Sequence, residues 1–189
     1  MKKTGVLLIQ LGTPDSPSVM DVRSYLSEFL NDPRVIDLPY LLRKILVNGI
    51  IVPFRAPKSA KIYKELWELG EGKSPLLTHT QALQALLQKN FEGENVTVEM
   101  AMRYQNPSLD SVLSRMQKEN YDQIIIIPLF PQYASASSGS AIAKAMTVTT
   151  PPFLGITPSS IKRDRSSGVV ITRIASITTV RRKNVTAFL

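Results

Sequence analysis

The sequence predicts an α/β fold built on a doubly wound parallel sheet, because strand-like and helix-like segments alternate along it. Residues 6–11 and 123–129 are nearly continuous apolar runs, and the second contains four consecutive isoleucines. Such runs are typical of strands that are buried on both faces of a parallel sheet. A third, alternating and β-rich segment covers residues 95–102. Amphipathic segments separate these strands, which indicates βαβ units with right-handed crossovers.

Helices are predicted between the strands from apolar residues that recur at helical spacing. Ser18 can cap the first helix, whose apolar positions include Val19 and Val22. Ser74-Pro75 opens a later helix that runs to about residue 90, since proline is favoured in the first turn. The remaining helical segments are predicted at 39–52, 57–69, 108–119 and in the last part of 134–146.

Composition divides the chain into a nearly neutral α/β domain, residues 1–146, and a basic Ser/Thr-rich tail, residues 147–189. The net charge is +8, and the tail holds seven of the 23 basic residues but one of the 15 acidic residues. The tail lacks helical periodicity, and only residues 168–177 alternate weakly like a strand. We expect the tail to be disordered or weakly structured. A shifted reading frame explains its acid-poor composition better than a natural terminal hairpin does.

Composition also excludes several classes of protein. The chain has no cysteine, so it can form no disulfide, no thiolate metal site and no cysteine-ligated iron–sulfur cluster. The N-terminal apolar run is too short for a secretory signal, and no run approaches the ~20 apolar residues that span a bilayer. We expect a cytoplasmic location. Peripheral membrane contact and the oligomeric state are left open.

Candidate functional residues occur where the predicted strands end, because ligands of parallel α/β sheets bind beyond the carboxyl ends of the strands. Arg103-Tyr104 follows one such strand, and an arginine can bind a carboxylate while the neighbouring ring packs on a flat ligand. Residues 129–140 combine Phe130 and Tyr133 with small and hydroxyl-bearing side chains, which allow a bulky planar ligand to approach the backbone. A surface arginine and a low-complexity linker are the plainer interpretations of the two segments.

Basic and hydroxyl-bearing residues also occur among the predicted helices. Arg55-Ala56-Pro57-Lys58 is followed by Tyr63 and later by Ser74. These residues form either a solvated cationic helix face or a rim that binds carboxylates beside an apolar surface. The single histidine, His79, has no carboxylate near it at metal-ligand spacing. We therefore expect a structural or surface role for His79 and predict no metal site.

Several segments resemble the ferrochelatase family, in the family's order and at about its spacing. They are residues 5–14 (GVLLIQLGTP), 55–58 (RAPK), 72–76 (GKSPL), 102–104 (MRY) and 129–133 (LFPQY) continued by Ser138-Gly139-Ser140. The resemblance covers residues 4–146. It implies one flavodoxin-like, chelatase-like half-domain of the two that enclose a porphyrin in this family. It also implies a parent activity in haem synthesis, the insertion of ferrous iron into protoporphyrin IX or coproporphyrin.

The resemblance implies a porphyrin-binding role for seven residues. Arg55, Tyr63 and Ser74 match positions that contact the porphyrin, and Arg55 is suited to a propionate. Leu11 matches the hydrophobic position at the face of the macrocycle. Three further residues match the pocket wall on the side from which the metal enters: Arg103, Tyr104 and Phe130. Ferrous iron is a substrate in this family, and no permanently bound cofactor is implied.

The resemblance does not extend to the residues that accept protons during metal insertion. In the family these are a histidine in a Ser-x-His-Gly-Leu/Ile-Pro motif and a downstream glutamate, both in the second half. This chain has no His-Gly pair, and residues 147–189 contain no glutamate. We therefore assign no catalytic residue and expect weak or absent turnover from what looks like a truncated chain. The alternatives are a non-catalytic tetrapyrrole-binding protein and, more remotely, a protein that binds nucleic acid through residues 162–183, although no aromatic residues interleave with that charge.

Overall fold

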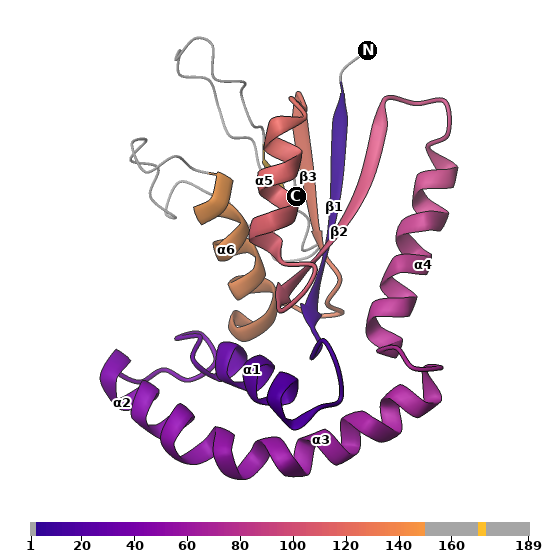
Figure 1. Ribbon diagram of the computed structural model, residues 1–189. Helices are drawn as coiled ribbons and strands as arrows, with labels where there is room; N and C mark the ends of the chain where they lie inside the picture. The colour runs from indigo at the N-terminus through magenta and orange to yellow at the C-terminus, as the bar shows by residue number, and fades with distance from the viewer. Residues whose placement is uncertain (1–2, 150–169, 173–189) are drawn as a thin grey trace.

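The computed structural model describes residues 3–149 and 170–172, which form a sheet with helices packed against it (Figure 1). Strands β1 (Thr4–Gly12), β2 (Val96–Tyr104) and β3 (Gln123–Pro128) are parallel, with β1 in the centre. The short strand β4 (Val170–Thr172) pairs antiparallel with β3, so the strand order is β2-β1-β3-β4. The predicted α/β fold with a parallel sheet is confirmed.

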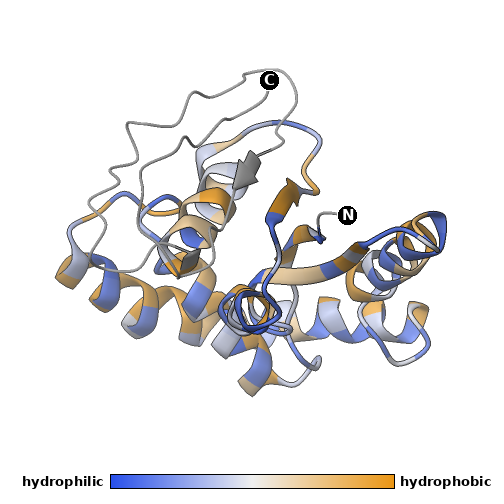
Figure 2. Cartoon of the chain, turned by 90° about the horizontal axis from the view of Figure 1, so that it is seen from above, coloured by the Kyte–Doolittle hydropathy of each residue, from blue (hydrophilic) through white to orange (hydrophobic). Residues whose placement is uncertain are grey.

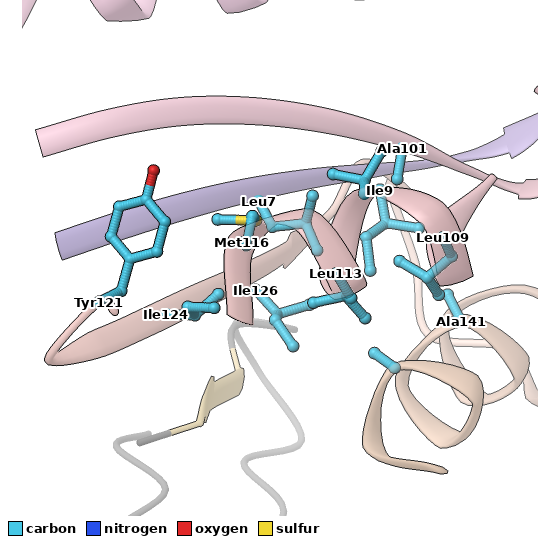
Figure 3. Close-up of a cluster of buried hydrophobic side chains, with 12 residues drawn as sticks. Leu7, Ile9, Ala101, Leu109, Leu113, Met116, Tyr121, Ile124, Ile126 and Ala141 are labelled. Atoms are coloured by element: carbon cyan, nitrogen blue, oxygen red, sulfur yellow. The ribbon is translucent and has the colours of Figure 1, made fainter. Parts of the chain in front are cut away.

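Helices cover both faces of the sheet, because side chains of β1 point alternately to the two sides. Leu7 and Ile9 pack into the core beneath α5 and α6, which Figure 3 shows in close-up. Val6 and Leu8 belong to the opposite core, which α4 covers. The three covering helices are α4 (Pro75–Asn90), α5 (Leu109–Lys118) and α6 (Ser140–Thr149).

Two further helical segments lie beyond the carboxyl ends of the strands (Figure 1). Their buried apolar residues pack with Tyr104, the last residue of β2. Ligands of parallel α/β proteins bind at this end of the sheet, so the segments border the expected site. They are α1 (Val19–Leu30) and a continuous run of α2 (Tyr40–Lys44), the π-helical η1 (Ile45–Ile51) and α3 (Val52–Leu69).

The structure corrects the predicted break between helices at 39–52 and 57–69. The backbone continues as a helix across this gap, and Pro57 lies inside α3. Pro57 removes one N–H donor, but apolar residues on the buried side of the run hold it against the rest of the molecule. The five-residue step between two of them, Val47 and Val52, does not fit the face of an α-helix. The i→i+5 geometry of η1 accommodates that step.

The predicted helix caps and strand ends agree closely with the structure. Ser18 and Ser108 each accept a hydrogen bond from the backbone N–H three residues further on, as expected for N-caps. Strand β2 runs two residues beyond the predicted segment, so Arg103 and Tyr104 form its end. Both side chains are therefore positioned by the sheet and not by a loop.

The predicted turn and helix at 134–146 consist of a π-helical turn, η2 (Ser135–Gly139), followed by α6. Helix α6 reaches Thr149, three residues past the expected end of the domain at residue 146. Strand β4 lies within residues 168–177, where the sequence alternates weakly. The rest of the expected tail lies outside the described residues, so its weak structure and its origin in a shifted frame stay predictions.

Within the described part of the chain, the outer edge of β2 is closed by two glutamines of α4. Gln84 Nε2 donates to the carbonyl of Val98 at 2.9 Å, and Gln88 Nε2 donates to the carbonyl of Val96 at 3.1 Å. Gln88 Oε1 also accepts from the N–H of Val98 at 2.7 Å. An open strand edge can pair with a strand of another chain. The two glutamine side chains instead bind the backbone N–H and C=O groups of this edge.

Candidate functional site

A buried carboxylate, Asp32, connects three elements at the carboxyl end of β2. Asp32 follows α1, and its Oδ2 accepts from Arg103 Nη2 at 2.7 Å, from Tyr104 Oη at 2.9 Å and from the hydroxyl of Ser140. Its Oδ1 accepts from the backbone N–H of Arg34 at 2.8 Å. We call Asp32, Arg103, Tyr104 and Ser140 the Asp32 network. The network joins the segment after α1 to the end of β2 and the first residue of α6.

The ionisation states within the Asp32 network follow from its hydrogen bonds. Burial alone would raise the pKa of Asp32, but hydrogen bonds from Ser140, Arg34 and Tyr104 and the charge of Arg103 hold it below its usual value. Burial raises the pKa of the Tyr104 phenol to about 12, so this hydroxyl stays protonated at neutral pH. The side chains of Arg103 and Asp32 are 14% and 6% exposed. They form a neutral, largely buried ion pair.

A pocket of about 740 Å³ opens over the Asp32 network. Asp32, Arg103 and Ser140 contribute to its wall, and Arg34 and Lys44 lie along its sides. The remaining lining is largely polar and includes hydroxyl, amide and charged groups. We call this the polar pocket. Its charged and hydroxyl-bearing side chains can bind the polar or charged edge of a ligand.

An aromatic part of the core adjoins the Asp32 network through Tyr104, which is buried. The rings of Phe29 and Tyr104 meet edge to face with centroids 5.2 Å apart, and those of Tyr25 and Tyr63 do so at 6.2 Å. We call these four residues the aromatic cluster. Leu11, at the end of β1, packs against the same group of residues. Three of the predicted porphyrin contacts, Leu11, Tyr63 and Tyr104, therefore lie together.

An exposed cation, Arg55, lies beside the aromatic cluster. Burial raises the pKa of both Tyr25 and Tyr63, which share a hydrogen bond, and the nearby charge of Arg55 partly offsets this effect. Arg55 is exposed on α3, and within the described residues no salt bridge is recorded for it. Its charge is therefore available to a ligand, unlike that of Arg103.

Ser74 lies in a second, smaller pocket of about 290 Å³. Its side chain is buried, with the residue 4% exposed, directly before α4. Trp67 lines the same pocket, and its ring meets that of Tyr63 with centroids 6.0 Å apart. Ser74 is thus connected to the aromatic cluster through Trp67 and is separate from the polar pocket.

Phe130 packs elsewhere. Its ring contacts the core that lies beneath α5 and α6, away from the group around Tyr104. The structure therefore brings together Leu11, Tyr63 and Tyr104, joins Arg103 to Tyr104 through Asp32, and separates Phe130 from them. The porphyrin-binding roles of the seven residues stay predictions.

Sequence reasoning missed Asp32, whose carboxylate accepts four hydrogen bonds. Asn31-Asp32-Pro33 follows a helix and has the composition of an ordinary turn, so no local signal marks it. Its partners Arg103 and Ser140 lie 71 and 108 residues away in the sequence. Ser140 belongs to the segment 129–140 that resembles the family, but its link to Asp32 depends on the tertiary structure.

Nothing in the described residues forms a metal centre of the usual kind. No group of three or more His, Cys, Asp or Glu side chains in residues 3–149 is placed to hold a metal ion. His79 is exposed on α4 and lines neither pocket. The exposed position agrees with the surface role expected for this histidine.

Comparison with known proteins places these features in one family. The family model described as Ferrochelatase matches residues 3–163. The chain belongs to the ferrochelatase family. The match extends beyond residues 4–146, the range inferred from the motifs, and includes residues 147–163 of the expected tail.

Curated relatives from several bacteria agree with this assignment. A protein named ferrochelatase from Chromobacterium violaceum is 48% identical over 150 residues, which cover 77% of this chain and 40% of the relative. One from Coxiella burnetii is 46% identical over 140 residues, covering 74% and 39%. One from Actinobacillus pleuropneumoniae is 45% identical over 150 residues, covering 77% and 46%. The chain matches less than half of the length of these relatives.

Proposed function

We propose that this chain supplies the porphyrin-binding half of a ferrochelatase, an enzyme that inserts ferrous iron into protoporphyrin IX or coproporphyrin. The supporting observation is the partly exposed edge of the aromatic cluster, formed by Phe29 and Tyr63 together with Leu11, with the exposed Arg55 beside it at the carboxyl end of the sheet. A porphyrin is a flat apolar disc with carboxylates along one edge. It needs an apolar surface for the disc and a cation for the edge.

The two arginines at this end of the sheet have different roles in this proposal. Arg55 binds a propionate, because its charge is exposed and uncompensated within the described residues. Arg103 is already neutralised by Asp32, so it acts as an oriented hydrogen-bond donor at the polar pocket. Leu11 and Tyr63 support the macrocycle from the side of the aromatic cluster.

Metal insertion replaces two pyrrole protons by one ferrous ion, so the reaction requires a group that accepts protons. Ferrous iron is a substrate here, and no resident cofactor is proposed. Tyr104, with a pKa of about 12, is protonated at neutral pH, and Asp32 is engaged by four donors. His79 lies on α4 outside both pockets. We therefore propose that this 189-residue chain binds porphyrin but turns over weakly or not at all by itself.

The experiment is a titration of the purified chain with protoporphyrin IX, followed by the Soret absorbance, and an iron-insertion assay on the same preparation. A saturable Soret shift is expected, with insertion far below that of a full-length ferrochelatase assayed in parallel. Absence of binding would contradict the porphyrin site. Turnover equal to that of the full-length enzyme would contradict the proposed lack of a proton acceptor.

A cytoplasmic location with peripheral membrane contact is part of the proposal. None of the described helices is long and apolar enough to cross a membrane. Hydrophobic positions recur along the run from α2 to α3 (Figure 2), and many of them are exposed. They are Tyr40, Leu41, Leu42, Ile45, Ile50, Phe54, Ile62, Leu66 and Leu69. Such a helix can lie in the plane of a membrane interface. Co-sedimentation of the chain with lipid vesicles tests this contact, and Leu41→Glu should reduce the amount that co-sediments.

A further inference from the structure

We propose that Asp32 is a positioning residue of the porphyrin site: it holds Arg103, which lines the polar pocket, in the orientation in which it faces the ligand, without contacting the ligand itself. This inference rests on the proposed porphyrin-binding function. It deepens that function because it names the group on which one of the expected contacts, Arg103, depends.

The hydrogen bonds of Asp32 leave it little capacity for any other role. A carboxylate offers about four lone-pair sites, and Asp32 accepts four hydrogen bonds, three at Oδ2 and one at Oδ1. Its side chain is 6% exposed. A carboxylate so engaged is a poor proton acceptor and a poor ligand for an incoming group. Any effect of Asp32 on porphyrin binding must therefore pass through its partners.

Arg103 is held at two points and retains free donors. Its Nη2 donates to Asp32 at 2.7 Å and its Nε donates to the Ser140 hydroxyl at 2.8 Å. The guanidinium carbon lies 4.4 Å from the centroid of the Tyr104 ring. Within the described residues no partner is recorded for Nη1, and Arg103 lines the polar pocket. A planar guanidinium anchored at two nitrogens presents its remaining donors in a defined direction.

Tyr104 depends on the same carboxylate. Its hydroxyl donates to Asp32 Oδ2 at 2.9 Å and lies 3.2 Å from Ser140 Oγ, while its ring packs against Phe29 of α1. Asp32 lies two residues after the end of α1. The carboxylate thus fixes the tilt of the Tyr104 ring and links α1 to the end of β2. Tyr104 is 1% exposed, so it is a buried support of the Asp32 network, and Arg103 is the group that can reach a ligand in the polar pocket.

The test is a double-mutant cycle on the full chain, with protoporphyrin IX as the probe and the dissociation constant as the readout. Asp32→Asn keeps the size of the side chain and removes its charge. It should weaken binding by about tenfold, because the guanidinium of Arg103 loses the anchor that orients its remaining donors toward the ligand. In the Arg103→Gln background the same change should have little further effect, since Asp32 acts through Arg103. A purely structural role would instead lower the free energy of unfolding and leave the dissociation constant of the folded chain unchanged.

Glu99→Gln is the matched control. Glu99 lies on the same strand as Arg103 and pairs with Arg115 at the same 2.7 Å, but it does not line the polar pocket. It should leave porphyrin affinity unchanged. Ser140→Ala provides a second variant if Asp32→Asn does not fold, because it removes the hydroxyl that bridges Asp32 and Arg103. Its effect should likewise vanish in the Arg103→Gln background.

Each result has one meaning. Weaker binding that is non-additive with Arg103→Gln supports the inference. Unchanged affinity in Asp32→Asn, or additive effects, overturns it while leaving the proposed function in place. If the wild-type chain binds no porphyrin, the proposed function itself fails and this inference falls with it.

Discussion

At the scale of single residues, the site separates two cations that look alike in the sequence. Arg103 shares a buried ion pair with Asp32, whereas Arg55 is exposed beside Tyr63. Their sequence contexts, an arginine before an alanine and an arginine before a tyrosine, do not distinguish a neutralised from a free guanidinium. The difference arises because Asp32 comes to the end of β2 only in the folded chain.

Replacing Arg55 should weaken binding of the propionates and not of the ring. Arg55→Gln is expected to lower the affinity for protoporphyrin IX by about tenfold, because a charge-assisted contact to a carboxylate is lost. Affinity for the dimethyl ester of the same porphyrin, which has no carboxylate, should stay unchanged. Lys61→Gln, an exposed position on the same helix, is the control. Equal losses for the acid and the ester would contradict the assignment.

Asp32 should also affect how the free energy of unfolding depends on pH. The pKa of Asp32 is lower in the folded chain than in the unfolded chain, where it is about 3.9. Its contribution to the free energy of unfolding is therefore complete above the unfolded pKa and is lost as the pH falls through the folded pKa. The free energy of unfolding should therefore fall more steeply in the wild type than in Asp32→Asn below about pH 4. Urea unfolding followed by circular dichroism at a series of pH values measures this. Parallel pH profiles for the two chains would refute it.

At the scale of elements, most helices and strands were predictable, and the exceptions have physical causes. Periodicity located β1, β3 and α4, and the serines before α1 and α5 cap them as expected. The run from α2 to α3 is continuous where the sequence predicts two helices, 39–52 and 57–69, although proline at position 57 disfavours a helix interior. Burial of Val52 and Ala56 against the rest of the molecule outweighs that local preference.

Two glycines should respond in opposite ways to a methyl group. Gly49, in η1, has no heavy atom within 4 Å of the position that a Cβ would take, so Gly49→Ala should stabilise the chain by about 0.5–1 kcal/mol. Gly12 has a φ of +120°, and a Cβ there would lie 2.1 Å from the carbonyl oxygen of Tyr104. Gly12→Ala should therefore destabilise the chain by more than about 1 kcal/mol. Chemical denaturation of both variants decides whether the signs differ.

The glutamines that close the edge of β2 make a third prediction at this scale. Gln88→Ala removes the two hydrogen bonds to Val96 and Val98, so we expect a loss of about 1–2 kcal/mol and more self-association. Gln81→Ala, an exposed position on the same helix with no recorded bond to β2, should change neither quantity. Denaturation and light scattering at increasing protein concentration measure the two effects. A Gln88→Ala chain that matches the control would show that the edge needs no closure.

At the scale of the whole molecule, the described residues form a half-domain with a long apolar side exposed on the run from α2 to α3. Ligand binding to the folded state alone stabilises it by mass action. Saturating protoporphyrin IX should therefore raise the midpoint of thermal unfolding, with the shift growing with porphyrin concentration. The same experiment with Arg55→Gln should show a smaller shift at equal concentration. A midpoint that does not depend on porphyrin would argue against a site in the folded chain.

The sequence by itself determined the fold class and the family. Buried strands carry continuous apolar runs, caps carry serine, and the motifs of the family are local, so each can be found without the partners that they meet in space. Only the tertiary structure decided which of the predicted site residues share a surface. It placed Leu11, Tyr63 and Tyr104 together, moved Phe130 to another core, and brought Asp32 to Arg103. The reason is that the hydrogen bonds and packing in the site join residues that are far apart in the sequence. A local sequence pattern does not indicate which distant residues come into contact.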